Sequence, residues 1–420
     1  MAILYDVIFI VFAVLYFPYL IVRKKWHAGF SMRWGVFPRV LREALDSKSN
    51  IWIHAVSVGE VLAVAGLIKS IKDTFPFYQI IISTVTTTGY QVAKKTFADD
   101  IVIYAPFDLS WVVRRYIRMI NPKIYLAAET EIWPNLFWAL YKRGIPIIQV
   151  NGRISNKAYA GYKIIKPFLQ KIIQCVEVFC MQSDSDSQKI KELGAPADRV
   201  HTLGNIKFDD ILSSETRDEA KFVLDNKARV IVAGSTHPGE EEILLDIFKT
   251  LKKEFPTLRL IIAPRHIERS DEIIGLIKQM GFLAEKFSQL NHSLDGDCII
   301  VVDSVGHLKS LYGLATLVFV GKSLKVGGGQ NIIEPASFAK PVFVGPHMEN
   351  FRDIVGIFLK EEAIIQVKDA SQLLSKMKQF LRSPVEREKI GRRAKDVVEK
   401  NTGATARTMN IITTIMVNAK

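Results

Sequence analysis

Hydrophobic residues follow two alternating patterns between residues 51 and 203. Short apolar runs rich in isoleucine and valine are typical of strands buried on both faces of a sheet. The segments between them repeat apolar residues every three or four positions, as Leu67, Ile68 and Ile71 do, which is typical of amphipathic helices. This alternation predicts a parallel α/β sheet. Its expected strands are Ile51–Val56, Gln79–Thr84, Ile101–Tyr104, Lys123–Ala128, Pro146–Val150, Val176–Met181 and Val200–Leu203.

The strand pattern lapses after residue 206 into a polar, charged stretch and then begins again. The second set of expected strands is Val230–Gly234, Leu258–Ala263, Cys298–Val302, Thr316–Val320, Pro341–Val344 and Ala363–Val367. A long helical pattern runs from Val385 to the C-terminus. We therefore predict two α/β domains of similar size, which face each other across a cleft lined by strand ends. The predicted segments are an N-terminal anchor (1–25), a first domain (26–206), a linker (207–225), a second domain (226–400) and a C-terminal helix (401–420) that could pack back on the first domain.

The N-terminal segment differs from the rest of the chain. Ile3–Val22 is almost wholly apolar, broken only by Asp6 and Pro18, and the cations Arg23–Lys25 follow it. About 20 apolar residues can span a bilayer core, and cations after the segment place the remaining chain in the cytoplasm. The segment therefore predicts a membrane anchor. Asp6 and Pro18 instead favour a helix that lies in the membrane interface or packs on the protein, and both interpretations stand.

Composition narrows the choice of partner. Of the 420 residues, 49% are hydrophobic and 24% charged, as in folded proteins. The net charge of +13 predicts an anionic partner, and the two stretches 21–42 and 151–171, which contain cations and no acid, favour an anionic amphiphile. No segment resembles a nucleic-acid-binding module. The three cysteines fit no zinc spacing and no disulfide framework, which is typical of a reducing compartment.

A glutamate follows the first expected strand at the start of a helix. Ser57 and Glu60 have the spacing of a capping box, in which each side chain satisfies a backbone N–H of the other residue. At the carboxyl end of a strand and beside His54, Glu60 could instead be a general base. A helix N-terminus should keep Glu60 ionised, although this stabilisation makes it a weaker base.

A second acid, Glu129, occupies the same kind of position. It directly follows the five apolar or aromatic residues 124–128, so it should be more sheltered than an ordinary acid at a helix start. Favourable interaction with the helix dipole is an equally good explanation.

Three strand ends in the second half carry groups suited to an anion. Residues 234–240 form a strand–turn–helix whose helix N-terminus could hold an anion, and Arg265 could pair with a phosphate. The glycine loop 327–329 leads to Glu334, which could accept hydrogen bonds from sugar hydroxyls. Together they predict a nucleotide site. The chain has no G-x-G-x-x-G after the first strand of either half, no P-loop and no metal-binding cluster.

Six motifs in this order resemble those of the bacterial 3-deoxy-D-manno-octulosonic acid (Kdo) transferases, which act on the lipid A precursor. The resemblance covers nearly the whole chain. The motifs are Trp52–Glu60, Glu129–Pro134, Leu203–Asp209, Ala233–His237, Ala263–His266 and Gly328–Pro335.

The resemblance implies a GT-B glycosyltransferase of two Rossmann-like domains, with the acceptor bound by the first and CMP-Kdo by the second. It makes Glu60 the catalytic base of an inverting transfer and gives Glu129 and Lys207 the stabilisation of the transition state. The CMP contacts that it implies are Pro264, Arg265, Gly306, His307, Leu308, Asn331, Ile332, Ile333 and Glu334. It also implies lipid IVA as acceptor, lipopolysaccharide biosynthesis on the cytoplasmic face of the inner membrane, and no cofactor or catalytic metal.

Two other functions fit the residues less well. One is a membrane-associated GT-B enzyme with a different nucleotide sugar and a different lipid acceptor. The other is a two-domain binding protein that closes on a small anion without turnover, which would not require strand-end carboxylates.

Overall fold

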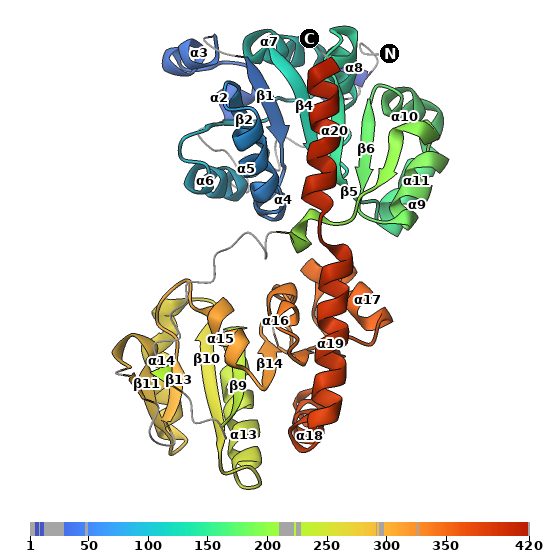
Figure 1. The fold of residues 1–420 in the computed structure, drawn as a ribbon. Helices are drawn as coiled ribbons and strands as arrows, with labels where there is room; N and C mark the ends of the chain where they lie inside the picture. The colour runs from blue at the N-terminus through green and yellow to red at the C-terminus, as the bar shows by residue number, and fades with distance from the viewer. Residues whose placement is uncertain are drawn as a thin grey trace. The chain divides into compact units, whose positions relative to one another are not determined.

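In the computed structural model the chain forms two compact units (Figure 1). The first unit comprises Met1–Ser213 and Thr402–Lys420, and the second comprises Ser214–Asn401. The structure describes residues 5–7, 9–11, 29–46, 49–209, 222–223, 228–290, 292–293, 298–325 and 327–418.

The first unit is built on a seven-stranded sheet in the order β3-β2-β1-β4-β5-β6-β7. Every pairing in it is parallel, which confirms the predicted parallel α/β sheet. The seven expected strands all form, with ends shifted by a few residues. Their bounds are β1 Asn50–His54, β2 Gln79–Thr84, β3 Ile101–Tyr104, β4 Pro122–Ala128, β5 Ile147–Gly152, β6 Val178–Met181 and β7 Val200–Thr202.

Helices cover both faces of this sheet. Trp52, Ile81 and Tyr125 face a core that also contains side chains of α3, α7, α8, α10 and α11. Ile51 and Ile82 face the opposite core, with α4, α5, α6 and α20. The bounds are α2 Phe30–Arg33, α3 Arg39–Asp46, α4 Val58–Ala63, α5 Ala65–Thr74, α6 Thr87–Thr96, α7 Ser110–Ile120, α8 Pro134–Lys142, α9 Asn156–Ile164, α10 Lys166–Ile173, α11 Asp184–Glu192 and α20 Ala404–Asn418, with 3-10 turns η1 Ala197–Arg199 and η2 Ile206–Phe208.

The second unit contains another seven-stranded parallel sheet, in the order β11-β13-β10-β9-β14-β15-β16. The prediction missed edge strand β11, because it is short and its Leu283 is 70% exposed, so no apolar run marks it. It also missed a two-stranded sheet of β8 Phe222–Val223 and β12 His292–Ser293. The main strands are β9 Arg229–Thr236, β10 Leu258–Pro264, β11 Leu283–Lys286, β13 Cys298–Val301, β14 Leu317–Val320, β15 Val342–Val344 and β16 Ile365–Gln366.

The long C-terminal helix predicted from Val385 is two helices. Gly403 has φ +86°, a conformation that ends a helix, and it separates α19 in the second unit from α20 in the first. The helices of the second unit are α13 Glu240–Lys252, α14 Ser270–Gln279, α15 Leu308–Leu314, α16 Ile333–Ser337, α17 Arg352–Lys360, α18 Ala370–Arg382 and α19 Pro384–Asn401, with 3-10 turns η3 Ile267–Arg269, η4 Phe287–Gln289 and η5 Glu349–Phe351.

Part of the predicted linker belongs to the first unit. Lys207 lies in η2, and both carboxylate oxygens of Asp209 accept hydrogen bonds from the backbone N–H groups of Gly403 and Thr405 at the start of α20. Most of residues 210–225 lie outside the described residues. The two units meet in the sequence between Ser213 and Ser214.

Most of the predicted anchor, 1–25, lies outside the described residues. The helical residues 5–7 and 9–11 pack on the first unit: Asp6 Oδ1 accepts hydrogen bonds from Ser110 N (3.0 Å) and Asn135 Nδ2 (2.7 Å), and Tyr5 stacks on Phe168. Such contacts are those of a helix packed on the protein. No helix within the described ranges has the length and apolar character needed to cross a bilayer.

We expect the stability of the first unit to depend on α20. Ile412 is fully buried in the core beneath this helix, so Ile412→Ala should destabilise the first unit by about 2–5 kcal/mol. Hydrogen exchange followed by mass spectrometry would show faster exchange in β1, β2 and β4, with the sheet of the second unit unchanged. Val417 on the same helix is 58% exposed, and Val417→Ala is the matched control. Equal effects of the two variants would contradict the assignment of α20 to the first core.

Candidate active site

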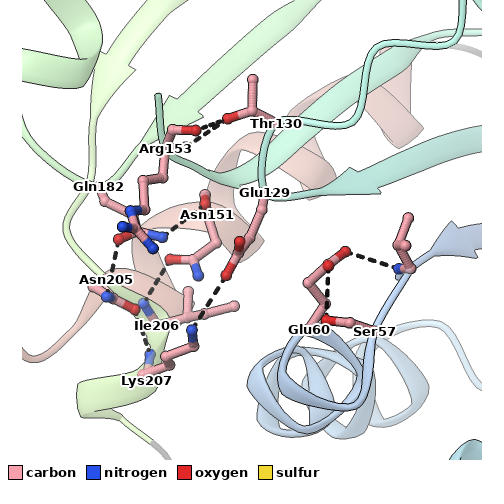
Figure 2. Close-up of polar contacts among 11 residues, drawn as sticks. Ser57, Glu60, Glu129, Thr130, Asn151, Arg153, Gln182, Asn205, Ile206 and Lys207 are labelled. Atoms are coloured by element: carbon pink, nitrogen blue, oxygen red, sulfur yellow. Dashed lines mark hydrogen bonds and ion pairs between the residues drawn. The ribbon is translucent and has the colours of Figure 1, made fainter. Parts of the chain in front are cut away.

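Two strands of the first unit end at the point where the direction of strand order reverses. The sheet grows from β1 toward β2 on one side and toward β4 on the other, and ligands of open α/β sheets bind at such switch points. Glu60 follows β1 and Glu129 follows β4. Figure 2 shows the Glu129 side chain pointing toward Lys207, with the Glu60 carboxylate turned toward Ser57 and the end of β1.

Glu60 is held by one backbone and one side-chain donor. Val56 N donates to Glu60 Oε2 (2.8 Å), and Ser57 Oγ donates to Glu60 Oε1 (2.9 Å). The predicted capping box does not form, because the Ser57 hydroxyl accepts no helix N–H and the Glu60 carboxylate accepts from Val56 N instead of Ser57 N. Glu60 is 8% exposed and has a fixed orientation.

Burial makes Glu60 a stronger base than the sequence predicted. Its pKa is raised, mainly by burial and secondarily by the negative charge of Glu129, while the Val56 N–H and Ser57 hydroxyl oppose the shift. The donors at the helix start lower this pKa, as expected, but desolvation raises it by more.

Glu129 adopts an unusual backbone conformation. Its φ is +52°, a left-handed value that is sterically unfavourable for a residue with a Cβ. Hydrogen bonds from Glu129 N to Val150 O (2.9 Å) and from Gln149 Nε2 to Glu129 O (2.7 Å) hold it there. Such residues occur often at functional sites. The conformation directs the carboxylate to Lys207, whose Nζ lies 3.2 Å from Glu129 Oε1.

A network of amides positions Lys207, and the sequence analysis missed it. Asn205 Oδ1 accepts from Lys207 N (3.0 Å), and Asn151 Oδ1 accepts from Ile206 N (3.1 Å). Gln182 Nε2 donates to Asn151 O, and Gln182 Oε1 accepts from Asn205 Nδ2, each at 3.0 Å (Figure 2). Asn151 lies at the end of β5 with φ +55°, so examining the end of every strand would have found it.

Glu131 is a third carboxylate in the same environment. Burial, followed by the charges of Glu60 and Glu129, raises its pKa to about 7, although the Trp133 indole opposes the shift. Glu131 therefore titrates near neutral pH. The sequence analysis quoted it within a motif and gave it no role.

His54 is not a partner of Glu60. It is 1% exposed and its Nδ1 lies 2.9 Å from Ser83 Oγ. Burial lowers its pKa to about 4, so its imidazole is neutral at physiological pH. His54 belongs to the polar part of the core.

In the second unit, the donor-site candidates lie at the carboxyl ends of neighbouring strands. Pro264 ends β10, and Arg265 N donates to Thr236 O at the end of β9 (3.0 Å). The Arg265 side chain is exposed. These positions leave its guanidinium accessible to a ligand.

The remaining candidates start two adjacent helices. Gly306, His307 and Leu308 lead into α15, and Asn331, Ile332, Ile333 and Glu334 lead into α16. Burial raises the pKa of Glu334, and Lys309 of α15 opposes this, so the two helix starts lie close together. Ile332 and Ile333 are buried in the core, which leaves only their backbone for contact with a ligand.

Comparison with known proteins identifies the family. A family model described as 3-deoxy-D-manno-octulosonic-acid transferase (kdotransferase) matches residues 28–210. A 3-deoxy-D-manno-octulosonic acid transferase of Rickettsia conorii is 34% identical over 81% of this chain and 73% of its own length. A solved glycosyltransferase from Rickettsia africae shares the fold with a TM-score of 0.51 at 14% identity, over 88% of this chain and 99% of that one, which supports the GT-B architecture. A 3-deoxy-D-manno-octulosonic acid transferase of Haemophilus influenzae is 32% identical over 86% of both chains, and the chain thus belongs to the Kdo transferase family.

Proposed function

We propose that the protein transfers Kdo from CMP-Kdo to a hydroxyl group of lipid IVA, the phosphorylated lipid A precursor, in lipopolysaccharide biosynthesis. The observation that carries the proposal is the grouping of Glu60, Glu129 and Lys207 at one edge of the first sheet, in a chain of the Kdo transferase family. No cofactor and no catalytic metal are part of the proposal.

The reaction is a single inverting displacement. Glu60 takes the proton of the acceptor hydroxyl, whose oxygen forms a bond to the anomeric carbon of Kdo. The bond from that carbon to the phosphate oxygen breaks, and CMP leaves with the electron pair. The raised pKa of Glu60 suits this role, since a base with a pKa closer to the working pH accepts a proton more readily. Lys207, oriented by Glu129 at 3.2 Å, supplies positive charge for the transition state.

The outer surface of the first unit supports an acceptor at the surface of the inner membrane, with the protein on the cytoplasmic face. Trp34, Val36 and Val40 are exposed, the last by 78%, next to the cations Arg39 and Arg42. Apolar side chains beside cations suit a layer of anionic headgroups over acyl chains. The N-terminal segment 1–25 would add to this attachment.

The test of the proposal is transfer by a Glu60 variant. Glu60→Gln should lower the transfer rate by about 10²–10⁴-fold, because glutamine cannot accept the proton. The purified protein is incubated with CMP-Kdo and lipid IVA, and the lipid products are weighed by mass spectrometry. Glu177→Gln removes an exposed acid of the same unit and should transfer normally. Normal transfer by a folded Glu60→Gln protein would contradict the role of Glu60 as the general base.

The pH profile tests the coupling between the carboxylates. Glu129 raises the pKa of Glu60, so Glu129→Gln should lower that pKa and keep the base ionised at lower pH. The acid limb of kcat/KM against pH should therefore move to lower pH, in addition to any loss of rate. Glu192→Gln, at an exposed position of α11, should leave the limb in place. An acid limb that stays or moves upward in Glu129→Gln would contradict the coupling.

Arg265 tests the donor site. Arg265→Ala should weaken inhibition by CMP about 10-fold or more, because a guanidinium can pair with its phosphate. Lys278→Ala, on α14, removes a charge elsewhere in the same unit and serves as control. Unchanged inhibition in Arg265→Ala would remove this residue from the donor site.

Stronger thermal protection of the wild type by UDP than by CMP would favour a different nucleotide sugar.

A further inference from the structure

A lysine lies at the switch point of the second sheet. Chain order runs from β9 toward β10 on one side and toward β14 on the other (Figure 1). The carboxyl ends of β9 and β14 therefore lie at the point where open α/β sheets usually bind ligands. Lys322 is the second residue after β14. In the first unit, Glu129 directly follows the corresponding strand, β4.

Lys322 shares the left-handed backbone of Glu129. Its φ is +56°, a conformation that suits glycine and is unfavourable for a residue with a Cβ. Two hydrogen bonds enforce it: Lys322 N donates to Glu240 Oε2 (2.8 Å), and Gly329 N donates to Lys322 O (2.7 Å). Backbone strain of this kind is frequent at functional sites.

Glu240 of α13 binds the backbone of the loop after β14 and is not a counter-ion for the Lys322 ammonium. Glu240 is fully buried, and four backbone N–H groups share its charge. His237 N and Lys322 N donate to Oε2 (3.0 and 2.8 Å), and Ser323 N and Leu324 N donate to Oε1 (2.9 and 3.0 Å). Glu240 thus fixes the loop after β14 against the loop after β9, with its acceptor capacity used by the backbone.

The Lys322 side chain crosses the glycine loop. A methyl group at Gly328 would come within 3.2 Å of Lys322 Cε, so the absence of a side chain at Gly328 makes room for the lysine. Glu349, the acid beside this loop, accepts from Gly328 N (2.8 Å) and lies 3.4 Å from His347 Nδ1. Within the part of the chain that the structure describes, no carboxylate pairs with the Lys322 ammonium, which is half-buried.

We propose that Lys322 binds the phosphate group of the donor nucleotide and makes the second unit selective for a phosphorylated nucleoside over the free nucleoside. The inference rests on the proposed function, because it takes the second unit as the donor site. Among the described residues this half-buried ammonium has no carboxylate partner, and a phosphate would supply one. A compact ammonium suits a phosphate oxygen. The carboxylate of Kdo offers similar chemistry, and the experiment separates the two.

The experiment measures binding of CMP, cytidine and free Kdo to the full-length protein by calorimetry. Lys322→Met should weaken CMP binding about 10- to 100-fold and leave cytidine and Kdo unchanged, since only CMP carries the phosphate. Lys278→Met removes the same charge from an exposed position on α14 and should stay within about 2-fold of the wild type. Lys322→Arg should recover part of the affinity.

Lys322→Gly separates binding from stability. Glycine adopts a φ of +56° without strain, so this variant should unfold at the same temperature as the wild type or higher, and yet bind CMP as weakly as Lys322→Met. A residue with only a structural role could not give this combination.

Several results would overturn the inference. Equal CMP affinity in Lys322→Met and Lys278→Met would exclude a phosphate contact, and an equal loss of cytidine affinity would indicate a damaged loop. A loss confined to free Kdo would assign the lysine to the sugar carboxylate. A wild-type protein that binds no CMP would overturn the donor assignment itself, whereas normal CMP binding with an unaffected Lys322→Met would overturn this inference alone.

Discussion

Parallel strand direction is the constraint on which the candidate site depends. Because β1, β4 and β5 all run the same way, the residues after them emerge at a single edge of the sheet. Glu60, Glu129 and Asn151 reach that edge although Glu60 and Asn151 are 91 residues apart in the sequence. The second sheet repeats the arrangement with Lys322.

Burial raises the pKa of a carboxyl group, whereas hydrogen bonds donated to its oxygens lower that pKa. In Glu60, one backbone N–H and one hydroxyl do not offset burial, and the carboxylate remains a base. Glu240 receives four N–H groups and holds two loops together. Glu131, with its pKa near 7, has the least compensation. The carboxylate that joins two loops thus has more backbone donors than the carboxylate at the candidate site.

Sequence pattern predicted the strands well because parallel strands are apolar on both faces. It failed at β11, whose exposed Leu283 gives no such run. At the site, the strand-end rule located Glu60 and Glu129, but pattern alone could not decide whether Glu60 caps a helix or accepts a proton. That depends on burial and on which atom donates to which, and both arise from tertiary packing. The left-handed φ of Lys322 has no signature in the sequence, whereas asparagine adopts this conformation more often and gives a weak signal at Asn151.

The return of α20 to the first unit has a consequence during synthesis. The second unit is one continuous stretch, 214–401, whereas the first needs residues from both sides of it. Domains usually fold in the order in which the ribosome makes them. Here the first unit cannot complete its core until α20 has been synthesised, so the apolar surface that Ile412 covers stays exposed to solvent. The second unit already has its complete sequence at that stage. A nascent chain halted before residue 404 would therefore carry one finished unit and one unit that exposes a binding surface for chaperones.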